Sequence, residues 1–429
     1  MSQVVRKLGL LFILLDNLFV PVDVSFDFRV HYILYFLFIF YYLLVQRTIR
    51  FRLTNLLSIA TLIFILFLAP LIKGSGYLEF AKQISLIVFN IIFSYLLIDA
   101  YRFDLERIFI DYIQLIYFAA IVGFIQLISQ IVGFKYGADY SYLGFDMQNF
   151  TMENWKMQSW FQEPSFMAIG FAPVVFVGIS RFFNLTNLIS IQKAIVIITA
   201  LILSQSSVGL IGLLLSFAII ITTKYSLLKS PLFIMGAFII LLSLSFGFYS
   251  FPQVKLRVDD TVGLFFNDHV SAKDIEKANL STYSMYSNFK VTQAAFMDSP
   301  ILGSGLGTYE LNYFRYINDV LPKNRITEMY LLNSSDANSM FLRVSAELGL
   351  TGILLLGWFL IANRIRLNLK LQSQLQINYW VINSSIFVLF LIRLLRQGHY
   401  TMLGFMLFVL MYHYSKKQFE ASVDEPIRD

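Results

Sequence analysis

Arginine is the residue type in this chain whose placement most suggests chemistry. Six arginines are of interest. Arg257, Arg315 and Arg325 lie in the long polar stretch at 251–337, and Arg343 lies about a turn inside the apolar run that follows. Arg393 and Arg396 lie at the end of the apolar run at 377–392. A guanidinium binds phosphate through two parallel hydrogen bonds and keeps its charge in a partly desolvated site. Interfacial anchoring or a loop salt bridge explains any one of them equally well. As a set, they predict a site for a phosphorylated ligand, above all a pyrophosphate.

Three residues are candidate proton acceptors. His399 follows Arg396 closely and precedes Tyr400, and an imidazole titrates close to neutral pH. Glu163 stands at the start of a predicted helix, where the alternative is an acid that interacts with the helix dipole. Glu328 lies where the polar stretch returns toward apolar sequence. His399, beside Arg393 and Arg396, is the best single candidate for the general base, and Glu328 and Glu163 are the alternatives.

Several kinds of site are excluded or unsupported. The chain has no cysteine, which rules out disulfides, zinc–cysteine sites and iron–sulfur clusters. It contains no Walker loop, no HExxH motif and no cluster of histidines and acids with metal-ligand spacing. The GSGLG segment at 303–307 lacks the strand–helix context of a nucleotide loop and predicts a turn. No metal and no cofactor is therefore predicted.

Composition identifies the broad class of protein. Of the 429 residues, 57% are hydrophobic and 14% charged, whereas soluble domains carry about 25% charged residues. The 44 Phe and 24 Tyr suit lipid contact and interfacial belts. We therefore predict an all-α, polytopic integral membrane protein.

Twelve apolar stretches approach the length of about 20 residues that crosses a bilayer. They lie at 8–24, 30–45, 53–72, 81–98, 108–133, 164–180, 188–204, 207–223, 232–250, 338–362, 377–392 and 399–415. The first imitates a secretory signal, but no small-residue cleavage site follows, so we expect a retained helix.

The distribution of Lys and Arg among the loops predicts a cytoplasmic N-terminus. This orientation puts three features outside: the loop at 134–163, the long loop at 251–337, and the connection that carries Arg393, Arg396 and His399. The chain then divides into spans one to nine (1–250), the long loop, spans ten to twelve (338–415) and a cytoplasmic tail (416–429). Amphipathic pieces at 287–297 and 311–320 predict short helices within the long loop.

Two segments resemble the paired signatures of the O-antigen ligase and polymerase superfamily. They are DSPILGSGLGTYE at 298–310 and NSMFLRVSAELGLTG at 338–352, in which nine residues separate Ser339 from Gly349. The EPS at 163–165 and the SQSSVG break at 204–209 are also similar to features of polysaccharide polymerases. Asn338 stands where the ligases have a histidine, which favours a polymerase.

The resemblance implies a GT-C-like, metal-independent glycosyltransferase of the bacterial cytoplasmic membrane, with its active site on the extracytoplasmic side. Its donor and acceptor would be glycans linked to undecaprenyl pyrophosphate, with membrane lipid, a chain-length regulator and a flippase as further partners and no nucleic acid. The expected catalytic residues are Arg315, Glu328, Asn338, Arg396, His399 and Glu163. The expected substrate-binding residues are Arg257, Arg325, Arg343, Arg393 and Tyr400.

Three other readings compete with the polymerase. A ligase would attach finished glycan to a final acceptor. A lipid-linked oligosaccharide flippase or other transporter suits twelve spans, but the long loop lies off-centre, and a transport site would lie near the midplane, where charges are scarce here. A membrane scaffold without activity would leave the outer arginines unexplained.

Overall fold

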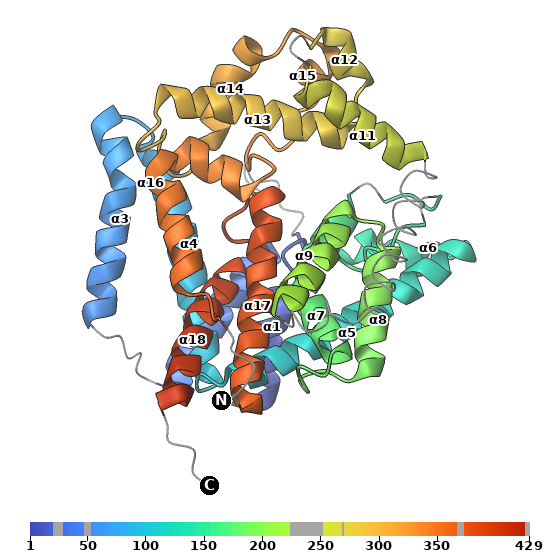
Figure 1. Cartoon of the computed structure of the whole chain (residues 1–429), viewed down its shortest axis with the longest axis vertical. Helices are drawn as coiled ribbons and strands as arrows, with labels where there is room; N and C mark the ends of the chain where they lie inside the picture. The colour runs from blue at the N-terminus through green and yellow to red at the C-terminus, as the bar shows by residue number, and fades with distance from the viewer. Residues whose placement is uncertain are drawn as a thin grey trace.

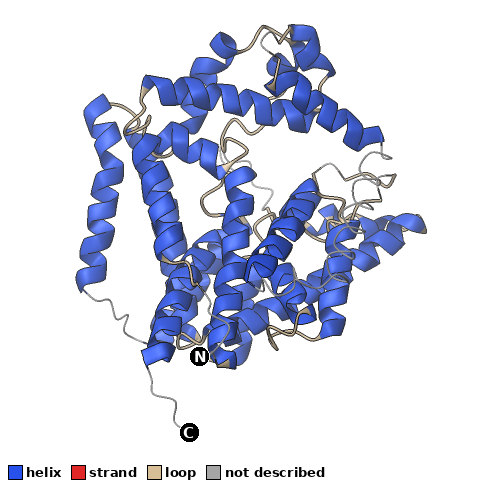
Figure 2. Ribbon diagram, viewed as in Figure 1, coloured by secondary structure: helices blue, strands red, loops and turns tan. Residues whose placement is uncertain are grey.

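The computed structural model describes residues 1–19, 29–46, 53–148, 150–153, 155–223, 252–267, 270–366 and 373–424. Within these residues the regular structure is helical (Figure 2), and extended backbone pairs only at isolated bridges. The predicted all-α class is therefore confirmed. The predicted span at 232–250 lies outside the described residues.

The first half of the structure runs through α1 (Gln3–Phe12), α2 (Val30–Gln46), α3 (Leu53–Lys73), α4 (Tyr77–Ala100), α5 (Leu105–Ile131), α6 (Lys135–Ala138), the 3-10 helix η1 (Ser141–Leu143), α7 (Pro164–Phe182), α8 (Ile191–Leu203) and α9 (Ser207–Thr223). The second half contains α11 (Pro252–Phe265), α12 (Ala272–Lys277), α13 (Leu280–Asp298), α14 (Tyr309–Val320), α15 (Arg325–Met329), α16 (Met340–Ala362), α17 (Gln374–Leu395), η3 (Met402–Gly404) and α18 (Phe405–Asp424).

Five helices in the described part of the chain are long and apolar enough to cross a membrane: α4, α5, α7, α16 and α17. The apolar helices α2, α8 and α9 are shorter, as is the described apolar part of α3. The protein is thus a membrane protein, in agreement with its composition. The first predicted span differs, because α1 ends at Phe12. After it, Asp16 accepts a hydrogen bond from the Leu403 amide, and the Asn17 side chain donates one to the Trp160 carbonyl.

Helices α11 to α15 form a layer across one end of the molecule, and α13 lies over the ends of the membrane helices (Figure 1). The N-terminus and the end of α18 lie at the opposite end. The layer has an apolar core of its own, which includes Tyr283, Tyr309 and Tyr313. Helices α13 and α14 contain both amphipathic pieces predicted for the long loop.

Helix α7 lies at the centre of the bundle and packs against α8, α9 and α17. Its residues 167–180 are all buried. The helix begins with Pro164, whose fixed φ suits the first helical position and whose missing N–H is not needed there. The start of this buried helix places Glu163 at the junction between the bundle and the helical layer.

Helix α16 bends at Gly349, whose backbone (φ 58°, ψ −150°) is not helical. The turn at 300–305 docks against this bend and satisfies backbone groups that the break leaves without helical partners. Leu350 N donates to Pro300 O (2.8 Å), Thr351 N to Ile301 O (3.0 Å), Ser304 N to Ala346 O (3.0 Å), and Gly305 N to Glu347 O (2.8 Å). The GSGLG segment is therefore the predicted turn, and the two signature segments form one backbone-to-backbone joint.

The backbones of the turn and of α16 approach so closely at the joint that only glycine fits at two positions. A Cβ on Gly303 would lie 2.3 Å from the carbonyl carbon of Glu347. A Cβ on Gly349 would lie 2.7 Å from the Gly303 nitrogen, and its positive φ already disfavours other residues. Neither neighbour can move aside, because both are backbone.

We predict that Gly349→Ala lowers the stability of the protein by about 1–3 kcal/mol, because it strains the bend and separates the joint. Gly357→Ala is the matched control, since Gly357 lies in the same helix with nothing within 4 Å of an added Cβ. Thermal unfolding of purified protein in detergent would measure both. Equal melting temperatures for the two variants would contradict the role of the joint.

Candidate active site

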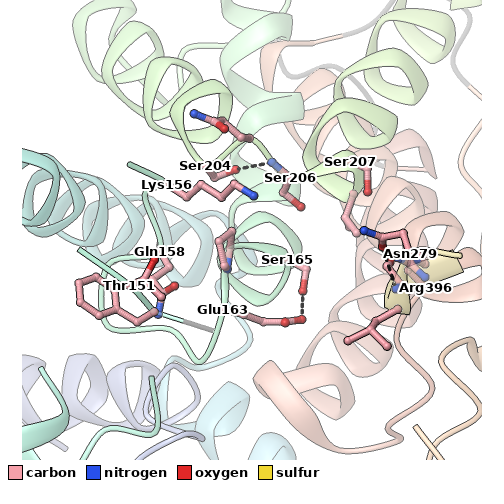
Figure 3. Close-up of a pocket in the computed structure, with 16 residues that line it drawn as sticks. Thr151, Lys156, Gln158, Glu163, Ser165, Ser204, Ser206, Ser207, Asn279 and Arg396 are labelled. Carbon is pink, nitrogen blue, oxygen red and sulfur yellow. Dashed lines mark hydrogen bonds between the residues drawn. The ribbon is translucent and has the colours of Figure 1, made fainter. Parts of the chain in front are cut away.

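A pocket of about 350 Å³ lies where the helical layer meets the bundle (Figure 3). Four segments that are distant in sequence contribute to it: the loop before α7, the elbow between α8 and α9, the start of α13, and the end of α17. Its lining comprises Phe150, Thr151, Lys156, Gln158, Glu163, Pro164, Ser165, Ser204, Gln205, Ser206, Ser207, Val208, Asn279, Leu280, Ser281 and Arg396. The pocket thus brings together Glu163, Arg396 and the SQSSVG break.

Glu163 is the N-cap residue of α7, but its side chain caps no helix amide. Its carbonyl oxygen instead accepts from the amides of Phe166 and Met167, and its carboxylate accepts a hydrogen bond from the Ser165 hydroxyl. Figure 3 shows this pair inside the pocket. The carboxylate therefore lies beside the pocket as a potential proton acceptor.

The loop that leads to Glu163 is held by Gln126 of α5, a fully buried side chain. Gln126 Oε1 accepts from the amides of Gln158 (3.0 Å) and Ser159 (2.8 Å), and its Nε2 donates to the Ala138 carbonyl at 3.0 Å. Ser159 has a positive φ of 55°, which these bonds help to maintain. Gln126 is a positioning residue that sequence reasoning missed, since nothing local distinguishes it.

The break between the two predicted spans at 188–204 and 207–223 is a sharp elbow. Ser204 Oγ donates to the Leu201 carbonyl at 2.6 Å and accepts from the Ser206 amide at 3.3 Å, while Gln205 has a φ of 51°. The elbow leaves Ser206 and Ser207 on the pocket wall. Helices α7, α9 and α13 all begin at this pocket, and the positive ends of their dipoles favour an anion there.

Arg396 ends α17 in an extended conformation and reaches the helical layer. Its Nη2 donates to Ser281 Oγ at 2.6 Å, close to Asn279, the N-cap of α13. Lys156 supplies a second cation to the same lining. Two cations, one carboxylate and many hydroxyl and amide groups can bind phosphate oxygens and sugar hydroxyls together. No local sequence pattern marks Lys156, Asn279 or Ser281 as site residues.

Arg343 belongs to a neighbouring, buried polar cluster. Its Nε donates to Glu347 Oε1 at 2.9 Å and its Nη2 to Gln83 Oε1 at 2.9 Å. Tyr400 OH donates to Glu347 Oε2 at 2.9 Å, and the guanidinium lies 4.4 Å from the centre of the Tyr400 ring. Arg343 and Tyr400 are thus brought together, but Glu347 neutralises the arginine.

His399 lies in the connection between α17 and α18 and pairs with Asp336, with 3.3 Å between Nε2 and Oδ2. Asn338 is its neighbour, because the Asn338 amide donates to Asp336 Oδ1 and the Asn338 carbonyl accepts from the Gln397 amide. Burial lowers the pKa of His399 to about 4, against the pull of Asp336. His399 and Asn338 therefore lie side by side, with Asp336 as their shared partner.

Arg393 is fully buried, and it shapes the connection that carries His399. Its Nη1 donates to the His399 carbonyl at 2.9 Å and its Nη2 to the Met402 carbonyl. The guanidinium lies 4.5 Å from the centre of the Phe405 ring. These contacts hold the connection that returns the chain from α17 to α18.

The other predicted site residues lie away from the pocket. Arg315 is 65% exposed and pairs with Asp298 at 3.7 Å, and Arg325 and Glu328 are exposed on the helical layer. Arg257 lies in α11, but its side chain is outside the description. Among the residues that the structure describes, no group of three His, Asp or Glu side chains could hold a metal ion.

The O-antigen ligase family model matches residues 192–357, so the resemblance inferred from the signature segments is confirmed. The match runs from α8 to α16 and includes the serine elbow, the glycine joint and Arg343. Family members are glycosyl-transferring enzymes that act on lipid-linked glycans, of the ligase or polymerase type. No curated protein matches the chain.

We predict that Glu347→Ala destabilises the protein by about 3–5 kcal/mol, because Arg343 would remain buried without its counter-charge. Asp298→Ala is the matched control, since it breaks the exposed pair with Arg315, which is worth about 0–1 kcal/mol. Thermal unfolding in detergent would compare the two. A loss of stability no larger for Glu347→Ala than for Asp298→Ala would refute the structural role of the buried pair.

Proposed function

We propose that this protein polymerises glycan repeat units carried on undecaprenyl pyrophosphate, at the outer face of the bacterial cytoplasmic membrane. The single observation that carries the proposal is the pocket that gathers Glu163, Lys156 and Arg396 where the helical layer meets the membrane helices. A lipid-linked glycan needs a site of this kind, since its chain lies in the bilayer and its sugars lie in water. The family match supports the reaction class.

In the proposed reaction, a hydroxyl of the acceptor sugar attacks the anomeric carbon of the donor. The new bond joins the acceptor oxygen to this carbon, and the bond from the carbon to the phosphate oxygen breaks, with its electron pair going to the pyrophosphate. The Glu163 carboxylate takes the hydroxyl proton. Arg396 and Lys156 stabilise the charge that develops on the leaving group, an effect that is strongest when the charges are already in place.

Geometry favours Glu163 as the base over the other two candidates. Glu163 shares the pocket with Arg396, whereas Glu328 is exposed on the helical layer. His399 pairs with Asp336 and does not line the pocket. We therefore propose that His399 and Asn338 lie beside the acceptor glycan and orient it.

The orientation of the protein also remains a proposal. The helical layer lies at the end opposite the N-terminus and the end of α18 (Figure 1), and the loop charges of the sequence predict a cytoplasmic N-terminus. The pocket then faces outward. A chain-length regulator and a flippase are the partners that such a polymerase would need.

A ligase is the second candidate, because the matched family model is that of the O-antigen ligase. The two activities differ in the acceptor: a polymerase transfers to another lipid-linked repeat, whereas a ligase transfers finished glycan to a different molecule. Asn338, in place of the histidine of the ligases, favours the polymerase.

We predict that Arg396→Ala and Glu163→Gln each reduce polymer formation by about 10²–10³-fold, because each removes a group that acts only as charge moves in the transition state. Arg315→Ala, an exposed arginine outside the pocket, should leave polymer formation unchanged. The glycan size distribution would be read on gels from a deletion strain complemented with each variant, with the protein level checked by immunoblot.

The same gels separate the candidate functions. Loss of the ladder with single repeat units still reaching the acceptor supports the polymerase. A ladder that persists on the lipid carrier without reaching a final acceptor would identify a ligase instead. Full-length glycan in both pocket variants would refute the assignment of the site.

A further inference from the structure

Arg396 is held both at its backbone and at the tip of its side chain. On the backbone side, the amide of the next residue, Gln397, donates to the Asn338 carbonyl at 2.9 Å. At the tip, Nη2 donates to Ser281 Oγ at 2.6 Å. The first bond fixes where the side chain begins, and the second fixes where its guanidinium lies.

The Ser281 hydroxyl is not needed to cap α13, although Ser281 lies in the first turn of that helix. Asn279 is the N-cap residue, and its side chain accepts a hydrogen bond from the Ser281 amide at 2.9 Å. Loss of the Ser281 hydroxyl would therefore remove the bond to Arg396 and leave the helix cap intact. Asn279, Ser281 and Arg396 all line the pocket (Figure 3).

The start of α13 is fixed in turn by α11. Asp260, a residue of α11, accepts a hydrogen bond at Oδ2 from the Asn279 amide at 2.8 Å. Together with the bonds at Ser281, this contact connects the Asp260 carboxylate to the Arg396 guanidinium. The connection runs through one helix cap and one hydroxyl, and it lies within the helical layer until it reaches Arg396.

The opposite end of α13 is fixed at the glycine joint. The Gly303 amide donates to the carbonyl of Ser299, the residue that follows α13, and α13 packs against α14 and α16. With 19 residues, α13 is about 28 Å long and connects the joint to the pocket. Ser281 is thus placed by a helix that is held at both ends, and such an element positions a side chain more precisely than a loop does.

A fixed guanidinium matters for the proposed reaction. A charged group stabilises a developing charge best when it is in place before the charge moves. A long arginine side chain has many rotamers, and a hydrogen bond at its tip restricts them. Because a guanidinium carries five N–H donors, the bond from Nη2 to Ser281 is compatible with further bonds from Arg396 to phosphate oxygens.

We propose that Ser281 is a positioning residue, which holds the Arg396 guanidinium in the orientation that meets the pyrophosphate leaving group. Asn279 and Asp260 in turn hold Ser281. This inference rests on the proposed function, because that function gives Arg396 its role. The competing role for a hydroxyl on the pocket wall is a direct hydrogen bond to the substrate.

A double-mutant cycle separates the two roles, with the protein reconstituted in nanodiscs. It compares the wild type, Ser281→Ala, Arg396→Ala and the double variant. One readout is the rate of glycan transfer from a lipid-linked donor. The other is the Kd for farnesyl diphosphate, a probe whose diphosphate resembles the leaving group after the bond has broken, so this readout does not require activity.

We expect Ser281→Ala to lower kcat by about tenfold while KM stays within about twofold, because the contact that is lost matters most as charge develops. The Kd for farnesyl diphosphate should rise by about tenfold. In the Arg396→Ala background, Ser281→Ala should change neither quantity, since a positioning residue has no effect once the group that it positions is gone.

Two further comparisons distinguish positioning from a loss of folding. Ser281→Thr keeps a hydroxyl and should recover most of the kcat that Ser281→Ala loses. Asp260→Ala should lower kcat by less than Ser281→Ala does, because it acts on Ser281 only through the helix cap. Asp259→Ala changes an exposed neighbour in the same helix and should match the wild type.

The outcomes separate this inference from the proposed function. Equal effects of Ser281→Ala in the two backgrounds, or no effect in the wild type, would overturn the positioning role and leave the polymerase intact. Coupled effects on the Kd for farnesyl diphosphate in a protein that forms no polymer would support the positioning role and refute the polymerase. Unchanged transfer and unchanged Kd in Arg396→Ala would refute both.

Discussion

The backbone joint at Gly349 is the constraint on which the rest of the arrangement depends. Hydrogen bonds from the turn at 300–305 hold the two halves of α16 at a fixed bend, and buried backbone groups that lose such partners are costly. The bend keeps the first half of α16 among the outer elements while the second half enters the bundle. It thereby places Arg343 and Glu347 against the connection that carries His399.

The arginines that suggested a phosphate site differ in the groups that their guanidinium nitrogens contact. Arg343 meets the Glu347 carboxylate, and Arg393 donates to two backbone carbonyls, so both are largely committed to the protein. Arg396 donates to the Ser281 hydroxyl and lines the pocket, which neither Arg343 nor Arg393 does. Position therefore distinguishes Arg396 from the two buried arginines as the candidate phosphate ligand.

The sequence pattern predicted those features that depend on residues close together in the chain. Hydrophobic runs predicted the helical class, and the SQSSVG segment predicted a break between two helices. The pairing of Arg343 with Glu347 was also within reach, since residues four apart share a face of a helix. The meeting of Glu163 with Arg396 was not, because it depends on how α7 and α17 pack. Gln126 carries no local signal at all, since its role is to bind amides of a distant loop.

The end of α17 lies between an apolar and a polar environment, and a lipid-linked substrate requires both. A lipid-linked substrate must keep its hydrocarbon chain out of water, whereas its pyrophosphate must stay out of the bilayer, and only a site at the boundary satisfies both. On α17, Leu394 faces apolar side chains and Arg396 faces hydroxyls and amides. Because one helix end supplies both surfaces, a shift of α17 would move them together. Buried Arg393 donates to two carbonyls of the connection leading into α18. These bonds hold the end of α17 in a fixed position relative to α18.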